Sequence, residues 1–138
     1  MKTSDQGIAA IVQREGCRNK AYKDTKGIWT CGVGHTGPEV CEGLVWTNDQ
    51  VKEALGRDLK ASEDAVNTVV YPLSQNQFDA LVSFVFNVGV TAFNKSTMKK
   101  YINLGKIVDA AAEFDKWNIP KEIIGRRNGE KAAFLKAQ

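Results

Sequence analysis

Three side chains near the start of the sequence have the types and the spacing that acid–base chemistry requires. Glu15 precedes a glycine suited to end a helix, Asp24 opens a turn sequence, and Thr30 lies where a strand should follow that turn. Cleavage of a glycosidic bond needs a carboxylic acid to protonate the leaving oxygen and a second carboxylate to attack the sugar or to activate water. Residues 15–35 therefore contain an acid, a base and a hydroxyl within one short segment.

The expected local structure suggests a role for each of these groups. At a helix C-terminus, Glu15 would face the negative end of the helix dipole, and burial beside the following hairpin would help to keep its carboxyl protonated. Asp24, in a more polar turn, would stay ionised and act as the base. The hydroxyl of Thr30 would orient the water that Asp24 deprotonates. Taken singly, all three are also common structural residues of helix ends, turns and strands.

The joint spacing of the three residues, followed by a Gly-Val-Gly-His sequence, resembles the signature of the phage-type lysozymes. These are the endolysins of the T4 lysozyme family, glycoside hydrolase family 24. The resemblance rests on residues 15–16, 21–25, 27, 30 and 32–37, and it continues through 77–89, 92–93, 117–118 and 125–130. It covers nearly the whole chain, with the blocks in the family's order.

The resemblance implies a muramidase that cleaves the β-1,4 bond between N-acetylmuramic acid and N-acetylglucosamine and so lyses the bacterial host. By matching position, Glu15 resembles the general acid, Asp24 the second carboxylate and Thr30 the catalytic threonine. Family members typically invert the anomeric centre. Inversion requires the two carboxyl groups to stand about 6.5 to 9.5 Å apart, so that a water molecule fits between them.

Further positions match family residues that line the saccharide cleft, namely Phe86, Asn87 and Ser96. Phe86 is equally suited to the core, and Asn87, two residues before Gly89, is equally suited to a helix C-cap. These three assignments therefore compete with purely structural roles.

The only histidine, His35, matches a structural position in the family rather than a catalytic base. The resemblance implies an ion pair between His35 and Asp58 on the following helix. Arg126 and Arg127 are suited to wall peptides or membrane phosphates, and equally to salt bridges at a helix start.

Hydrophobic periodicity and turn signals predict an α+β fold that is mostly helical. Capping boxes are expected at 3–6 and 47–50, and an irregular hairpin over 22–35. Helices are expected over residues 3–15, 47–69, 74–88, 96–104, 107–117 and 123–135. In the lysozyme-like arrangement that the resemblance implies, residues 1–138 form one domain, with a β-containing lobe over about 16–50, a linking helix over about 47–69, and a helical lobe over about 71–138 together with helix 3–15. The active-site cleft is expected between the lobes.

Composition limits the partners. The 138 residues suit one compact domain, and 19 Lys and Arg against 16 Asp and Glu leave a mild net charge of +3. A basic surplus after residue 95 would suit a polyanion, but a solvated lysine-rich helical surface explains it better, so we expect no nucleic-acid partner. The odd number of cysteines and their spacing to His35 match neither a disulfide framework nor a zinc site. No metal or cofactor is expected.

The chain shows no run near the roughly 18 apolar residues of a membrane span, and no apolar signal segment at its start. The resemblance implies an enzyme that is made in the bacterial cytoplasm and acts in the periplasm on the glycan strands of peptidoglycan. Without a signal segment, either a holin-type pore releases it or an N-terminal signal-anchor has been removed. We expect a monomer.

Three alternatives remain open. A lytic transglycosylase would cut the same bond with only one acidic residue and leave anhydro-muramic ends. A non-catalytic module would bind the cell wall or nucleic acid through the basic C-terminal half. A thiol enzyme using Cys31 and His35 would need the two on one strand face, and no third group is evident to orient the histidine.

Overall fold

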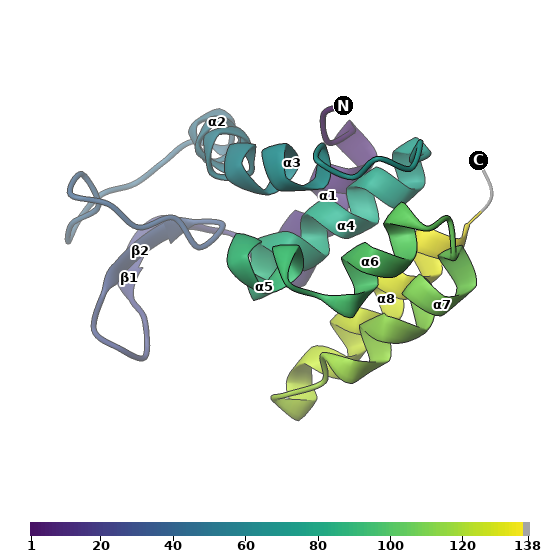
Figure 1. The fold of residues 1–138 in the computed structure, drawn as a ribbon. Helices are drawn as coiled ribbons and strands as arrows, with labels where there is room; N and C mark the ends of the chain where they lie inside the picture. Colours follow the sequence, from purple (N-terminus) through teal and green to yellow (C-terminus); the bar gives the residue numbers. More distant parts are fainter. Residues whose placement is uncertain (137–138) are drawn as a thin grey trace. The chain divides into compact units, whose positions relative to one another are not determined.

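The computed structural model describes residues 1–136, and the chain divides into two compact units. Residues 9–60 form the hairpin unit. Residues 1–8 and the chain from residue 61 onward form the helical unit. The helices together with one two-stranded antiparallel sheet confirm the predicted α+β class (Figure 1). No helix within the described residues is both long and apolar enough to cross a lipid bilayer.

The hairpin consists of β1 (Arg18–Lys23) and β2 (Trp29–Gly32), which pair antiparallel. Tyr22 lies opposite Thr30, but the register shifts between Arg18 and Tyr22. The shift frees backbone groups of β1 to pair elsewhere, which makes this small sheet irregular, as predicted. The predicted start of the hairpin at residue 22 is wrong, because β1 begins at Arg18.

The loop after the hairpin supplies those partners. The Trp46 N–H donates to the Asn19 carbonyl at 2.7 Å, and the Asn19 side chain donates back to the Trp46 carbonyl at 2.9 Å. A small apolar cluster lies in the same unit. Its buried members are Ala21, Cys31 and Val40, and the partly buried Trp29, Leu44 and Trp46 pack against it. Two strands alone are marginally stable in water, so this loop and cluster support the hairpin.

The linking helix expected over 47–69 is two helices, α2 (Asn48–Asp58) and α3 (Lys60–Val66). The capping box at the start of α2, between Thr47 and Gln50, is present as predicted. The interruption falls at the buried Leu59, whose ψ of −15° lies well short of the helical value of about −42°. The division between the two units follows one residue later, so α2 belongs to the hairpin unit and α3, after its first residue, to the helical unit.

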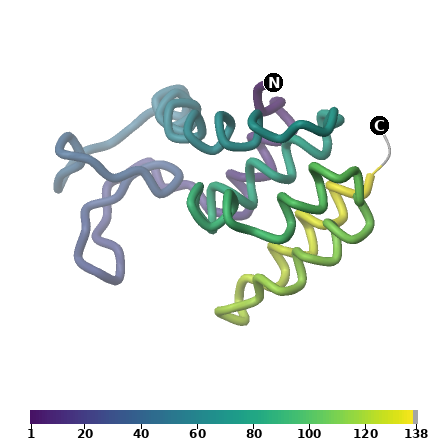
Figure 2. Tube along the Cα trace, in the orientation of Figure 1, coloured from purple at the N-terminus to yellow at the C-terminus, as the bar shows by residue number. Residues whose placement is uncertain are grey.

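The helical unit contains the remaining helices. They are α4 (Gln75–Val88), α5 (Val90–Asn94), α6 (Thr97–Asn103), α7 (Ile107–Glu113), η1 (Phe114–Lys116), η2 (Lys121–Ile123) and α8 (Ile124–Leu135). α4 packs against α8, α6 against α7, and α7 against α8, as the teal, green and yellow segments of Figure 2 show. Phe114 links this core, because its ring lies 5.3 Å from Phe84 and 5.6 Å from Phe134.

Three short elements differ from the prediction. One is the 3-10 turn η2, which lies where a connecting segment was expected before the last helix. The helix expected over 107–117 ends as an α-helix at Glu113 and continues as the 3-10 turn η1. α5 was not predicted, because five residues after Gly89 are too few for a periodic pattern.

The capping box predicted at residues 3–6 is wrong. α1 (Asp5–Glu15) begins one residue later than that box requires, and the hydroxyl of Ser4 accepts from the Gly7 N–H at 3.1 Å. Thr3 instead donates its N–H and its hydroxyl to Glu63, both at 2.7 Å. The carboxylate of Glu63, distant in the sequence, thus binds Thr3, which the local sequence favoured as the N-cap of α1.

Two glycines near the end of the hairpin allow a test of its packing. Gly32 and Gly34 both have a left-handed φ, +68° and +69°, but a Cβ on Gly32 would lie 3.3 Å from the Trp46 ring, whereas one on Gly34 would meet nothing within 4 Å. Gly34→Ala should lower the free energy of unfolding by about 1 kcal/mol through backbone strain alone. Gly32→Ala should cost about 1 kcal/mol more, measured by urea denaturation. Equal losses of unfolding free energy in the two variants would contradict a tight contact between Gly32 and the Trp46 ring.

Candidate active site

Asp24 organises the turn that joins the two strands. Its backbone N–H donates to the Ile28 carbonyl at 2.9 Å. Its carboxylate oxygen Oδ1 accepts from the N–H groups of Lys26 at 2.8 Å and Ile28 at 2.9 Å. Since both bonds use Oδ1, the oxygen Oδ2 is the one available to a water molecule.

Thr30 is joined to the backbone carbonyl of the same residue, Ile28. Its side chain is buried, with the residue 4% exposed, and its hydroxyl donates to the Ile28 carbonyl at 3.0 Å. The carbonyl of Ile28 therefore accepts from both Asp24 and Thr30, while the Ile28 N–H donates to Asp24. The structure brings these two candidate residues together through one backbone unit of the hairpin.

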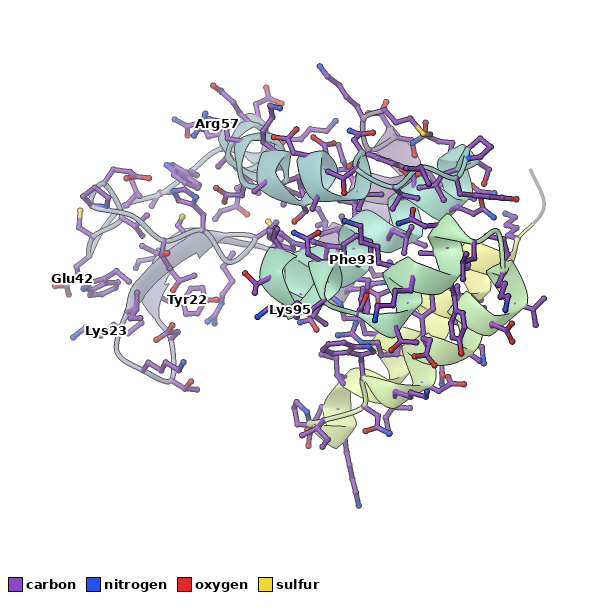
Figure 3. All side chains as sticks on the ribbon, viewed as in Figure 1. Tyr22, Lys23, Glu42, Arg57, Phe93 and Lys95 are labelled. Atoms are coloured by element: carbon purple, nitrogen blue, oxygen red, sulfur yellow. The ribbon has the colours of Figure 1, made fainter. Side chains whose placement is uncertain are left out.

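Charged side chains also lie over aromatic rings on this hairpin. The Arg18 guanidinium lies 4.4 Å from the ring centre of Tyr22, and the Lys23 ammonium lies 5.4 Å from that of Trp29. Figure 3 labels Tyr22 and Lys23 on β1. Such contacts stabilise exposed strands modestly, by about 0.5–1 kcal/mol each.

Glu15 is the last residue of α1, and Gly16 ends the helix as expected. Gly16 has a left-handed φ of +79°, and its N–H donates to the Val12 carbonyl at 2.8 Å. The side chain of Glu15 is exposed, so the predicted burial beside the hairpin is wrong. The residues that follow, Gly16 and Cys17, are exposed as well, so the hairpin does not cover the end of the helix.

His35 lies between two carboxylates of the hairpin unit. Its Nδ1 is 2.7 Å from Asp58 Oδ2 and its Nε2 is 2.6 Å from Glu39 Oε1. Partial burial lowers the pKa of His35, but the hydrogen bonds to Glu39 and Asp58 together raise it more, so the net pKa lies above its usual 6.5. The hydrogen bond from His35 in turn lowers the pKa of Glu39. Glu39 was missed because an acidic residue four positions after a histidine in a loop has no specific signature.

The thiol alternative is not supported by this geometry. Cys31 is fully buried, and burial raises the pKa of its thiol, which disfavours the nucleophilic thiolate. Its Sγ lies 3.4 Å from the Asn19 carbonyl, while the ring of His35 is engaged by Glu39 and Asp58. Within residues 1–136, no three His, Cys, Asp or Glu side chains are grouped to hold a metal ion.

The candidate saccharide-binding residues lie in the helical unit. Phe86 is partly buried and Asn87 is exposed in the last turn of α4. Ser96 is the N-cap of α6: its hydroxyl donates to the Phe93 carbonyl at 2.6 Å and accepts from the Lys99 N–H at 3.1 Å. Ser96 therefore has a structural role whether or not it also binds sugar.

Asn87 borders a pocket of about 350 Å³ in this unit. The other residues that line it are Val88, Lys116, Trp117, Asn118, Ile119 and Arg127. Arg127 holds two parts of this lining, because its guanidinium donates to the Asn87 side chain and, at 3.0 Å, to the Trp117 carbonyl. The wall of the pocket is thus fixed by one buried arginine.

Arg127 is in turn held by a carboxylate that sequence reasoning did not single out. Glu130 is fully buried and accepts from Arg127 at 2.5 Å, from Arg126 at 3.2 Å and from the Ser83 hydroxyl at 2.7 Å. Two roles were considered for Arg126 and Arg127, and the structure shows one of them: both arginines form salt bridges within α8. Arg127 and Arg126 lie three and four residues before Glu130, and this helical spacing was the sequence signal that could have indicated the salt bridges.

Comparison with known proteins gives consistent matches. The sequence model of the family described as "Phage lysozyme" matches residues 12–131. The chain is 42% identical to the endolysin of Salmonella phage P22, across 98% of this chain and 99% of that protein. A mutant of phage P22 lysozyme has a similar fold, with a TM-score of 0.93, 41% identity and 99% of each chain covered. The muramidase domain of SpmX from Asticaccaulis excentricus matches with a TM-score of 0.91 and 38% identity, again over 99% of each chain.

The contacts of His35 predict how stability changes with pH. Because the folded-state pKa of His35 is raised, its contribution is fully present below the unfolded value of 6.5 and is lost as pH rises through the folded value. The lowered pKa of Glu39 has the opposite effect, since its contribution is lost as pH falls below about 4.5. Stability measured by urea denaturation should therefore decline from pH 6 to pH 8.

The matched variant is His35→Asn, which removes the only histidine. Its unfolding free energy should be lower than that of the wild type at pH 6 and should change little between pH 6 and pH 8. The same decline in His35→Asn as in the wild type would show that another group is responsible.

Proposed function

This chain belongs to the phage lysozyme family, and from that premise we propose that it is an endolysin in which Glu15, Asp24 and Thr30 carry out catalysis. As a lysozyme it is a glycoside hydrolase that lyses peptidoglycan. The bond cleaved is the β-1,4 linkage between N-acetylmuramic acid and N-acetylglucosamine.

The arrangement around Ile28 is the observation that supports this proposal most directly. The Thr30 hydroxyl uses its proton on the Ile28 carbonyl, so its oxygen lone pairs can accept a hydrogen bond from water. Asp24 Oδ2 can accept the second proton of the same water molecule. A water held by both acceptors directs its own lone pair away from them, as attack on an anomeric carbon requires.

In the proposed reaction Glu15 protonates the oxygen of the leaving sugar while Asp24 removes a proton from the attacking water. Glu15 is exposed at the end of α1, where a polymeric substrate can approach it. Water enters on the face opposite the leaving group, so a β-linked substrate gives an α product. A carboxylate and a hydroxyl that together orient water favour hydrolysis over a transglycosylase reaction, which uses the sugar's own hydroxyl.

We further propose that Phe86, Asn87 and Ser96 line the saccharide-binding surface. Asn87 borders a pocket, which agrees with this role, whereas the hydroxyl of Ser96 also caps α6. Residues 1–138 are proposed to form one catalytic domain, which agrees with the match to the P22 endolysin along 99% of its own length. The enzyme is also proposed to act as a monomer. It is proposed to reach the periplasm by holin-type release and to have no nucleic-acid partner.

Replacement of the general acid tests this function. Glu15→Gln should reduce the clearing of chloroform-treated Gram-negative cells by at least about 100-fold, because the amide cannot protonate the leaving oxygen. Glu42→Gln is the matched control, since Glu42 is an exposed glutamate of the same unit, labelled in Figure 3. The control should clear cells at the wild-type rate.

The products distinguish the alternatives. Hydrolysis with inversion should release reducing muramic ends that appear first as the α-anomer in NMR spectra. Anhydro-muramic ends would identify a transglycosylase, and an initial β-anomer would contradict inversion. Clearing that survives in Glu15→Gln, or no clearing by the wild type, would contradict the catalytic proposal and favour a binding module.

A further inference from the structure

Three large apolar side chains of the helical unit remain on its surface. Val70 is 78% exposed, Leu104 is 69% exposed and Val108 is 77% exposed. Single exposed apolar residues are common on folded proteins and need no explanation. These three differ, because they come from two segments that meet at one end of the unit.

The segment before α4 meets the turn between α6 and α7. The Val70 N–H donates to Asn103 Oδ1 at 2.9 Å, and Asn103 directly precedes Leu104. A Cβ on Gly105 would lie 3.5 Å from the ring of Tyr71, so the turn passes next to this ring. Figure 1 shows both segments at the same end of the helical unit. Val70 and the turn therefore belong to one surface.

Backbone hydrogen bonds fix this turn. Leu104 is the C-cap of α6, and the Lys106 N–H donates to the Tyr101 carbonyl at 2.9 Å. α7 begins directly after Lys106, so Val108 lies in its first turn. The exposure of Leu104 and Val108 is therefore a property of an ordered backbone.

Positive charge accompanies these apolar side chains. Lys100 and Lys106 are exposed. Within residues 1–136 neither of them forms an ion pair, and Lys99 donates to neutral oxygens, such as Thr68 Oγ1 at 2.9 Å. Asp109 is the only acidic residue in the sequence from 99 to 109, which leaves three positive charges against one negative.

The combination of leucine, valine and lysine side chains narrows the kind of partner. Nucleic acids are bound mainly through charge and would not need the apolar residues. Protein interfaces are depleted in lysine, and a second copy of this chain on the same surface would bring the lysines of both copies together. An anionic lipid bilayer suits both components, because apolar side chains enter its interfacial region while lysine ammonium groups remain at the phosphates.

We propose that Val70, Leu104, Val108, Lys100 and Lys106 form a docking patch for an anionic lipid surface. The three apolar side chains enter between the headgroups, and the two lysines bind the lipid phosphates. A patch of this size gives weak, reversible binding rather than insertion into the bilayer. It contains none of the proposed catalytic or saccharide-binding residues, so the inference does not depend on the proposed function.

Cosedimentation with lipid vesicles at low salt tests the patch. One vesicle type contains equal parts of phosphatidylcholine and anionic phosphatidylglycerol, and the other contains phosphatidylcholine alone. Leu104→Ser removes an apolar side chain of the patch and Lys106→Gln removes a charge. Val45→Ser and Lys52→Gln are the matched controls, because both residues are exposed in the hairpin unit. Circular dichroism confirms that each variant is folded.

The measured quantity is the partition coefficient of the protein between water and vesicles. The wild type should bind the anionic vesicles at least about tenfold more strongly than the neutral ones. Leu104→Ser and Lys106→Gln should each lower binding to anionic vesicles about fivefold, whereas the two controls should keep the wild-type value. Added salt should weaken binding, because it screens the lysines. Lysis of purified peptidoglycan, which contains no membrane, should keep the wild-type rate in both patch variants.

Three outcomes would overturn the patch. The first is wild-type protein that does not prefer anionic vesicles, or controls that lose binding as much as the patch variants. The second is a loss in Lys106→Gln without a loss in Leu104→Ser, which would identify a surface for polyanions in general. The third is self-association that Leu104→Ser abolishes, without vesicle binding, which would make a second copy of the chain the occupant. Each of these outcomes leaves the enzymatic proposal unaffected, because lysis of purified peptidoglycan is measured separately.

Discussion

The backbone of Ile28 is the constraint on which the proposed site depends. Its carbonyl accepts hydrogen bonds from the Asp24 backbone and the Thr30 hydroxyl, and its N–H donates to the Asp24 carboxylate. Each such bond contributes only about 1 kcal/mol to stability, but together they fix the orientation of two side chains before any substrate binds. Preorganisation of this kind matters more to catalysis than to folding, because polar groups already in place need not reorganise during the reaction.

The turn can fix the positions of Asp24 and Thr30 only if the hairpin itself is stable. β1 and β2 are too short to be stable alone, and their support comes from the rest of the hairpin unit. The loop through Trp46 bonds to Asn19 on β1, and α2 packs against β2. His35, just after β2, connects to Asp58 at the end of α2. The protonation of His35 therefore influences the stability of the unit that carries all three candidate catalytic residues.

Much of the fold could be predicted because its signals are local. Gly16 ends α1, and Thr47 and Ser74 begin α2 and α4 with capping boxes whose partners lie three residues away. Other features depend on distant partners, and no local pattern reports them. Thr3 fails to cap α1 because Glu63 binds it, and the helix expected over 47–69 breaks at Leu59, one residue before the hairpin unit ends. In the candidate site, Asp24 and Thr30 could be identified from their residue types and spacing in the sequence, but their connection through Ile28 could not be predicted. The exposure of Glu15 and the burial of Glu130 likewise follow from packing.

Asp24→Asn provides the most direct test of the central claim, that Asp24 both forms the turn and acts as the base. An asparagine retains a side-chain oxygen for the Lys26 and Ile28 N–H groups but lacks the charge needed to take a proton from water. Amide hydrogen exchange at these two residues and the rate of peptidoglycan lysis should be measured on the same variant. The account predicts wild-type protection of both amides with lysis reduced at least about 100-fold. Wild-type lysis with the same protection would show that Asp24 only forms the turn, and would contradict the account.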